Sequence, residues 1–403
     1  MLKKINNKIK SIFFEEFKFV EVVILMIMTI TIGFFLGGFI TKKNYGLKQH
    51  YHEDNYLKEF INNYNYILEN YYGDLNEKEL LDKALKTILQ EIDDPYASYM
   101  DETESSNFDI QMNGSYTGLG VEVGTLKDDG RLIITNIFDD SPAKKAGLEI
   151  GDIIIKINDK NLEKLSSLEF SKTIKEQKGS FSLTVLRNEE EKKVELSLEK
   201  IILKSVDFEL FDNNIGYISI SIFADNTYIQ MREALEKLEQ NNIEALFIDV
   251  RSNTGGYLSS VVKILGLFLD SSRVIYQIQD KNGVKEYYSS GTKTKDYKIA
   301  ILTNSASASA SEILTAALKE NINAISVGKK TYGKGSAQKL HTLSDGNKYK
   351  FTTQKWLTPL GNSIDGIGVD VNFEVELEEK YYDEPSFEND SQLQKAISVL
   401  TGN

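Results

Sequence analysis

The sequence predicts a multidomain α+β protein, and three regions of different texture carry that prediction. An uncharged apolar run fills residues 22–40, short β runs separated by turns fill residues 108–200, and strands alternate with helices over residues 206–376. A length of 403 residues suggests two or three folded domains. We place the divisions as follows: a cytoplasmic segment 1–21, a membrane anchor 22–40, a helical arm 41–105, a β-rich domain 106–200, an α/β core 201–376 and a tail 377–403.

The apolar run at residues 22–40 is long enough to cross the hydrocarbon core of a bilayer as a helix. More lysines precede the run than follow it, which favours a cytoplasmic N-terminus and an extracytoplasmic location for the rest of the chain. No small-x-small cleavage site follows the run. We therefore expect an uncleaved, single-pass anchor in the cell membrane.

Composition excludes several classes of function. A net charge of −13 argues against nucleic acid as a partner, because binding to phosphates needs clustered cations. The absence of cysteine excludes disulfides, thiol chemistry and cysteine-based zinc sites. Only three histidines occur, His50, His52 and His341, so we expect neither a metal site nor a cofactor.

The helical arm is predicted by apolar residues that recur at helical spacing in two stretches between residues 51 and 91. Gly73 and Asp74 separate the two stretches. A dimerisation arm, which would make the protein a homodimer, and a hairpin packed on its own domain both fit this pattern. Residues 93–99 (DDPYASY) end the region.

In the β-rich domain, Pro142 begins a short helix, Gly147 ends it, and Gly151 turns the chain into a buried strand. Residues 140–154 (DSPAKKAGLEIGDII) resemble the helix–turn–strand signature of a PDZ domain. Gly118, Leu119 and Gly120 occupy the place of the PDZ carboxylate-binding loop. The resemblance implies that backbone N–H groups of this loop capture a chain-terminal carboxylate while the peptide adds to the sheet as a strand.

The α/β core reads as strands and helices in alternation, which predicts parallel strand pairing with right-handed crossovers. In such sheets, functional loops gather at the carboxyl ends of the strands. The loops that begin after the strands at 245–250 and 298–302 are both in that position. A short helix at 392–400 is expected after an acidic, flexible link.

Ser309 and Lys334 are the best candidates for catalysis. A serine hydroxyl is a poor nucleophile until a base takes its proton. With so few histidines in the chain, a lysine held neutral is the best candidate for that base. Simpler interpretations exist for each motif alone, since Ser309 followed by Glu312 fits a helix capping box and Gly-Lys-Gly fits a turn.

Residues 307–313 (SASASEI) and 331–335 (TYGKG) together resemble the C-terminal processing, or tail-specific, peptidases. These are serine proteases with a Ser/Lys dyad. The resemblance implies that Ser309 is the nucleophile, that Lys334 is the base and that Gln338 orients the lysine. It also implies a ClpP/crotonase-like α/β fold for the core.

Residues 249–256 (DVRSNTGG) resemble the Asp-Leu-Arg-x-Asn-x-Gly-Gly loop of the same peptidases. The resemblance implies an oxyanion hole made by a glycine N–H, from Gly255 or Gly256, and by the N–H of Ala310. Residues 93–99 are similar to the Leu-Asp-Pro-Tyr-Ser stretch that precedes the binding module in this family, and residues 356–370 are similar to its Tyr-Leu-Thr-Pro-x-Gly run.

The sequence therefore predicts a membrane-anchored, extracytoplasmic serine endopeptidase. Its PDZ domain would bind protein or peptide substrates with exposed apolar C-termini and present them to Ser309 and Lys334. The alternative is an anchored PDZ scaffold whose protease domain is silent.

Overall fold

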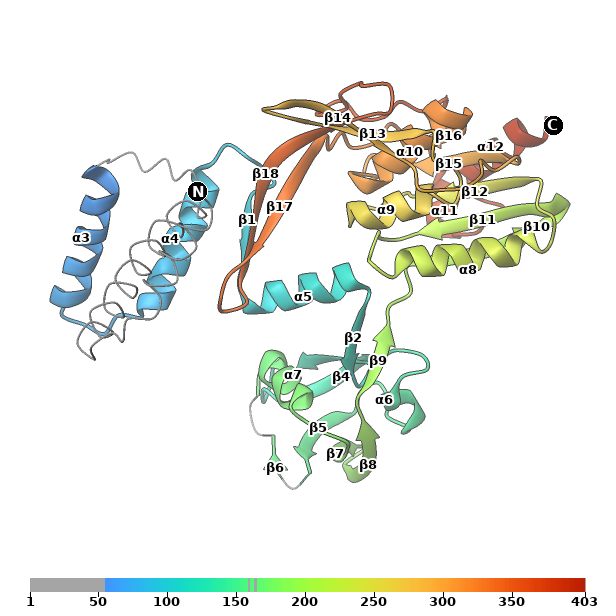
Figure 1. Ribbon diagram of the computed structural model, residues 1–403. Helices are drawn as coiled ribbons and strands as arrows, with labels where there is room; N and C mark the ends of the chain where they lie inside the picture. The colour runs from blue at the N-terminus through green and yellow to red at the C-terminus, as the bar shows by residue number, and fades with distance from the viewer. Residues whose placement is uncertain (1–54, 159, 163–164, 403) are drawn as a thin grey trace, which may run out of the picture. The chain divides into compact units, whose positions relative to one another are not determined.

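The computed structural model describes residues 55–158, 160–162 and 165–402 (Figure 1). The predicted cytoplasmic segment 1–21 and anchor 22–40 lie outside these residues. Within the described ranges, no helix has both the length and the apolar character needed to cross a membrane. The chain divides between Leu81 and Asp82 into two compact units, which are described separately.

The first unit contains α3 (Asn55–Asn70) and the start of α4 (Glu77–Glu91), which confirms the two predicted helices. None of the residues of α3 is buried. The hydroxyl of Tyr64 donates to the carbonyl of Glu77 at 3.3 Å. Whether this arm mediates dimerisation stays a prediction.

After the remainder of α4, the second unit continues with a short strand and a well-capped helix. Strand β1 (Ser98–Met100) precedes α5 (Glu102–Asn113). The Asp101 side chain accepts the N–H of Glu104, and the Glu104 side chain accepts the N–H of Asp101, so the two form a capping box.

The predicted PDZ region forms an antiparallel sheet in the order β3-β4-β5-β7-β8, with β6 paired to β5. Helices α6 and α7 pack with it around one apolar core. Ser141 caps α6, which begins at Pro142 as expected. The elements are β3 (Val121–Thr125), β4 (Leu132–Ile137), α6 (Pro142–Lys145), β5 (Ile153–Ile157), β6 (Lys160–Asn161), α7 (Ser167–Lys175), β7 (Ser180–Arg187) and β8 (Glu190–Ser197). The strands that flank this region in the sequence, β2 (Ser115–Gly118) and β9 (Glu199–Ile202), pair with each other in antiparallel orientation.

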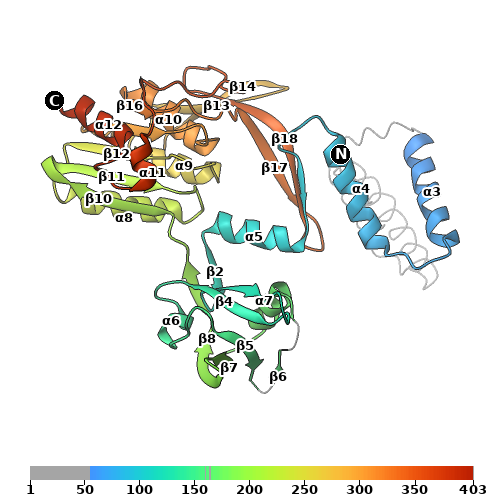
Figure 2. The same cartoon turned by 180° about the vertical axis from the view of Figure 1, so that it is seen from behind.

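The α/β core is built on a six-stranded sheet in the order β10-β11-β12-β15-β16-β19 (Figure 2). Within this sheet, β11, β12, β15, β16 and β19 are parallel, as predicted, and β10 pairs with β11 as an antiparallel edge strand. The strands are β10 (Val206–Phe211), β11 (Ile215–Ile220), β12 (Ala245–Asp249), β15 (Lys298–Thr303), β16 (Ile325–Gly328) and β19 (Phe373–Glu374). The helices α8 (Thr227–Glu239), α9 (Leu258–Leu265) and α10 (Ala310–Ile322) join them.

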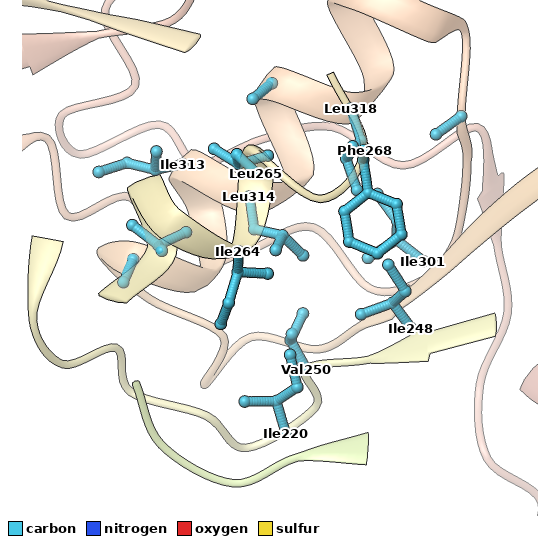
Figure 3. Close-up of a cluster of buried hydrophobic side chains, with 14 of the residues drawn as sticks. Ile220, Ile248, Val250, Ile264, Leu265, Phe268, Ile301, Ile313, Leu314 and Leu318 are labelled. Atoms are coloured by element: carbon cyan, nitrogen blue, oxygen red, sulfur yellow. The ribbon is translucent and has the colours of Figure 1, made fainter. Parts of the chain in front are cut away.

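Both faces of this sheet are covered, which explains why its strands read as continuous apolar runs. Alternate residues such as Ile248 and Ile301 point toward α9 and α10, where they meet Ile264 and Leu314 (Figure 3). The residues between them form a second cluster on the other face, with Leu393 and Ala396 of α12 (Ser391–Thr401).

The C-terminal tail is therefore part of the core. We expected an acidic, flexible link before the last helix, but this stretch contains α11 (Glu379–Asp383), and Asp390 is buried. Leu393 and Leu400 of α12 are buried against the sheet, so the tail adds apolar contacts rather than hanging free.

A second sheet, which the sequence did not predict, carries the residues after Lys334. Its path is β1-β18-β13-β14, and β17 pairs with β18 in an antiparallel hairpin. The strands are β13 (Val274–Asp280), β14 (Gly283–Tyr288), β17 (Ser336–Thr342) and β18 (Lys348–Leu357). Lys334 thus precedes a strand rather than lying in an isolated turn.

Candidate active site

Ser309 lies in a strained turn between β15 and α10. It is the N-cap of α10, and its φ of +55° and ψ of −112° are unfavourable for a residue with a side chain. Such backbone strain costs about 1–3 kcal/mol and persists only where the surroundings impose it. Its presence at this serine marks the turn as a functional one.

Loop 250–256 holds this turn in place. The carbonyl of Asn253 accepts the N–H of Ala308 at 3.0 Å and the hydroxyl of Ser311 at 2.8 Å. The Ser307 hydroxyl donates to the carbonyl of Val250 at 2.7 Å. The hydroxyls of the serines on either side of Ser309 are therefore tied to loop 250–256 and have structural roles.

Gly255 lies against the nucleophile. A Cβ at Gly255, whose φ is +109°, would lie 2.9 Å from the Ser309 Cβ and 3.2 Å from the Ala310 nitrogen. Only glycine fits this approach. The predicted oxyanion loop and the predicted nucleophile therefore meet.

The hydrogen bonds of this loop separate the two candidate glycines. The Gly255 N–H donates to Asn253 Oδ1 at 2.8 Å, and Asn253 is fully buried. The N–H groups of Gly256 and Ala310 donate to no acceptor within the described part of the chain. These two are therefore the donors available to an oxyanion.

The carboxylate of Glu312 joins the nucleophile loop to the lysine loop. Glu312 is completely buried. One oxygen accepts the Thr331 hydroxyl at 2.6 Å and the N–H of Gly333 at 2.7 Å. The other accepts the N–H groups of Ser309 at 2.8 Å and Lys334 at 2.9 Å. The capping box expected from the sequence is present, and the same carboxylate also fixes the backbone of the predicted base.

The side chain of Lys334 does not reach Ser309. Its Nζ lies 4.6 Å from the centroid of the Tyr96 ring, and no hydrogen bond joins it to Ser309 Oγ in the described structure. Burial and then the like charge of Lys350 lower the pKa of the Lys334 ammonium. The carboxylates of Asp94 and Glu312 oppose this shift. The net effect is a lowered pKa, so Lys334 loses its proton more readily than an exposed lysine does.

Gln338 also lies apart from the lysine side chain. Its Nε2 donates to the hydroxyls of Ser336 at 2.9 Å and Thr352 at 3.1 Å. No hydrogen bond joins it to Lys334 in the part of the chain that the structure describes. Its orienting role stays a prediction.

The predicted carboxylate-binding loop lies at one end of a groove between β3 and α7. The groove has a volume of about 460 Å³ and is lined by Gly118, Leu119, Phe170 and Ile174 among others. A Cβ at Gly120 would lie 2.2 Å from the Ser141 Cβ, so this position requires glycine. Among the described residues, the N–H groups of Leu119 and Gly120 have no acceptor. The groove therefore offers apolar walls and free donors together.

Comparisons with known proteins agree with this geometry. The model of "Peptidase family S41" matches residues 214–375, "PDZ domain" matches residues 107–186, and "Activating protease CtpB N-terminal domain" matches residues 40–104. A "Probable CtpA-like serine protease" of Staphylococcus haemolyticus (strain JCSC1435) is 31% identical over 374 residues, which are 91% of this chain and 74% of that protein. The chain belongs to the C-terminal processing peptidase family.

Two further matches extend this result. "Carboxy-terminal processing protease CtpB" of Bacillus subtilis (strain 168) is 37% identical over 314 residues, or 76% of this chain and 65% of that protein. The solved "Photosystem II D1 C-terminal processing protease" is 23% identical, with a TM-score of 0.46, covering 76% of this chain and 84% of that one. The match to the S41 family model and the CtpA-like and CtpB relatives show that the chain is a serine-type C-terminal processing peptidase, and it spans a little under two thirds of the Bacillus protein.

In this peptidase the C-terminal tail braces loop 249–256, the predicted oxyanion loop. The Arg251 guanidinium donates to Asp390 Oδ2 at 2.7 Å and to Gln392 Oε1 at 3.0 Å. It also pairs with Asp249, which accepts the Tyr217 hydroxyl at 2.8 Å. Burial acts to lower the pKa of Arg251, but the two carboxylates outweigh it and raise the pKa.

Several site residues escaped the sequence analysis. The sequence pattern gives Glu312 only a helix-capping role and shows Asn253 only as part of the Asp-Leu-Arg-x-Asn-x-Gly-Gly motif. It does not indicate Tyr96 or Asp390 as site residues. The position of Glu312 three residues after the nucleophile was the one available signal, because a capping carboxylate must lie close to the Ser309 N–H. In the described ranges, no three His, Cys, Asp or Glu side chains are placed to hold a metal ion.

Proposed function

We propose that the chain is a membrane-anchored, extracytoplasmic serine endopeptidase that cleaves through a Ser309/Lys334 dyad. The observation that supports it best is the Glu312 carboxylate, which accepts the backbone N–H groups of Ser309 and Lys334. A nucleophile and a base that act together need a common anchor of this kind. The free N–H groups of Gly256 and Ala310 beside the serine add the other component that acyl transfer needs.

In the proposed reaction, the Lys334 amine takes the hydroxyl proton while Ser309 Oγ attacks the scissile carbonyl. The N–H groups of Gly256 and Ala310 stabilise the oxyanion of the tetrahedral intermediate. The lysine then gives its proton to the leaving amine, and an acyl-enzyme remains on Ser309. A water molecule, with Lys334 again as base, releases the product and restores the serine.

Substrates are proposed to enter by their C-termini. The groove beside β3 has apolar walls and is lined by Leu119, and the N–H groups of Leu119 and of the next residue, Gly120, have no acceptor among the described residues. A peptide that added to β3 would place its terminal carboxylate at these donors and its last apolar side chain in the groove.

Residues 22–40 are proposed to anchor the enzyme in the cell membrane with the catalytic part outside. The uncharged run and its lysine bias support this topology. A protease added to intact spheroplasts should digest the region after Lys43. Protection until the spheroplasts are lysed would reverse the topology.

The catalytic proposal is tested with Ser309→Ala in the full-length protein and an unfolded substrate that has an apolar C-terminus. Ser305→Ala is the matched control, because Ser305 is an exposed serine of the same turn. We expect Ser309→Ala to lose cleavage while its unfolding temperature is retained, and Ser305→Ala to cleave normally. An active Ser309→Ala protein would refute the nucleophile. A parent protein that binds tails but cleaves nothing would support the silent scaffold instead.

Carboxylate capture is tested with a matched pair of peptides. An apolar peptide with a free C-terminal carboxylate should bind more tightly than its amide. Amidation removes the negative charge that the loop at Leu119 and Gly120 would hold. Equal affinities would remove this part of the proposal.

A further inference from the structure

We propose that Tyr96 is a positioning residue that holds the charged form of Lys334 away from Ser309 in the resting enzyme. This inference rests on the proposed role of Lys334 as the base. Tyr96 belongs to the segment between α4 and β1, far from the lysine in sequence, so its contact with the lysine is a property of the fold.

The contact geometry is that of a cation–π interaction. The Lys334 Nζ lies 4.6 Å from the centroid of the Tyr96 ring. An ammonium within about 6 Å of a ring centroid is attracted by the negative face of the ring, whereas a neutral amine gains little from it. The ring therefore favours the protonated lysine, which is the form that cannot act as a base.

Hydrogen bonds to Asp94 fix the segment that carries the Tyr96 ring. Asp94 accepts the N–H of Thr352 at 2.7 Å, the hydroxyl of Thr352 at 3.1 Å and the N–H of Tyr96 at 3.0 Å. Burial, and then the neighbouring Tyr332 hydroxyl, raise the pKa of the Tyr96 hydroxyl. The Gln338 amide donates to the same Thr352 hydroxyl. Gln338 and the segment of Tyr96 are thus fixed to one point on β18, on the lysine side of the site.

The charges around Lys334 come from three elements. Asp94 lies on the Tyr96 segment, Glu312 on α10 and Lys350 on β18. Asp365 acts on the neighbouring Tyr96 hydroxyl. Burial and Lys350 disfavour the ammonium, and the two carboxylates favour it. Like the two carboxylates, the Tyr96 ring favours the ammonium form of Lys334. Loss of the proton therefore weakens the contact with the ring, and movement of the side chain away from the ring makes the proton easier to lose.

The test compares Tyr96→Leu, which removes the ring, with Tyr96→Phe, which keeps its face. A cation–π contact corresponds to a shift of about 0.4–1.5 pH units in the lysine titration. We expect the rise of kcat/KM with pH to move down by about one unit in Tyr96→Leu and to stay in place in Tyr96→Phe. An unchanged or upward-shifted profile in Tyr96→Leu would overturn the proposal.

A second readout needs no activity. In a Ser309→Ala background, acetic anhydride labels the neutral lysine amine, and peptide mass spectrometry follows the labelling of Lys334 against pH. Exposed Lys339 on β17 is the internal reference. The labelling midpoint of Lys334 should fall in Tyr96→Leu but not in Tyr96→Phe. Tyr96→Met replaces the leucine variant if that variant does not fold.

The two readouts separate this inference from the proposed function. A labelling midpoint that does not move on loss of the ring refutes the role of Tyr96, whatever the activity. If the labelling midpoint moves but the Lys334→Ala variant still cleaves substrate, the contact is supported and the dyad is refuted.

Discussion

The proposed active site has a nucleophile half around Ser309 and a base half around Lys334, and the two differ in how they are held. Ser309, Gly256 and Ala310 present backbone or short side-chain groups. Asn253 and Glu312 already fix the backbone around them by accepting the N–H groups of Gly255, Ala308 and Ser309. The base half is fixed only in its backbone. The long side chain of Lys334 lies on Tyr96, and Gln338 is bonded elsewhere.

This difference indicates which half must move. Backbone donors at an oxyanion hole lose little by being fixed in advance, because the hydrogen bonds of the neighbouring residues hold them at no further cost. A buried lysine held permanently at the serine would have to remain desolvated and near neutral. In the resting arrangement the ammonium instead keeps a favourable partner in the ring of Tyr96.

The largest effect is expected from Lys334→Arg. Because guanidinium does not lose its proton in this pH range, the variant should be as inactive as Lys334→Ala, with kcat lower by about 10²–10⁴-fold. Exposed Lys339→Arg is the matched control. In the parent enzyme, kcat/KM should rise with pH because burial lowers the Lys334 pKa and the neutral amine is the active form. Full activity of Lys334→Arg would mean that the base half lies elsewhere.

Glu312→Gln should damage both halves at once. In the amide, an NH₂ donor replaces one carboxylate oxygen that accepts backbone N–H groups. Two sets of donors then face each other at a fully buried position. We expect the free energy of unfolding to fall by about 2–4 kcal/mol and kcat to fall with it. Denaturant unfolding measures the first, and Glu236→Gln on the exposed face of α8 is the control. A stable but inactive variant would show that Glu312 acts mainly on alignment.

Asn253→Ala tests the nucleophile half alone. It removes the side chain that holds the Gly255 N–H and donates to the Ile220 carbonyl. We expect kcat to fall by about 10–100-fold, with a smaller change in KM, since the oxyanion loop loses its alignment. The pH midpoint of kcat/KM should not move. A shifted midpoint would contradict the separation of the two halves.

Gln338→Ala should have the smallest effect. Its amide donates to Ser336 and Thr352 rather than to Lys334, so losing these two neutral hydrogen bonds is expected to lower kcat by only about threefold. Steady-state kinetics measures it. A loss as large as that of Lys334→Ala would show that Gln338 meets the lysine during the reaction.

Local sequence patterns predicted the α/β core well. The strands Ala245–Asp249 and Lys298–Thr303 are buried on both faces, so each is an apolar run that periodicity detects. Ser309 and the Gly255–Gly256 loop follow such strands, and the carboxyl ends of parallel strands bring them together.

The base half could not be predicted in the same way. The β17–β18 hairpin exposes many of its residues, and Lys339 and His341 interrupt any apolar alternation in β17. The Tyr96 contact joins segments that are distant in the sequence, and the Arg251–Asp390 pair does the same for the oxyanion loop and the tail. Such pairs depend on the fold and leave no local pattern.

The central claim, that Ser309 is the nucleophile and Lys334 its base, is tested most directly by mapping a covalent adduct. The full-length enzyme in detergent is treated with a fluorophosphonate over a range of pH, and the modified peptide is identified by mass spectrometry. We predict an adduct on Ser309 that forms faster as pH rises and that is nearly lost in Lys334→Arg. An adduct on another residue, or one that forms on Ser309 at the parent rate in Lys334→Arg, would contradict the account.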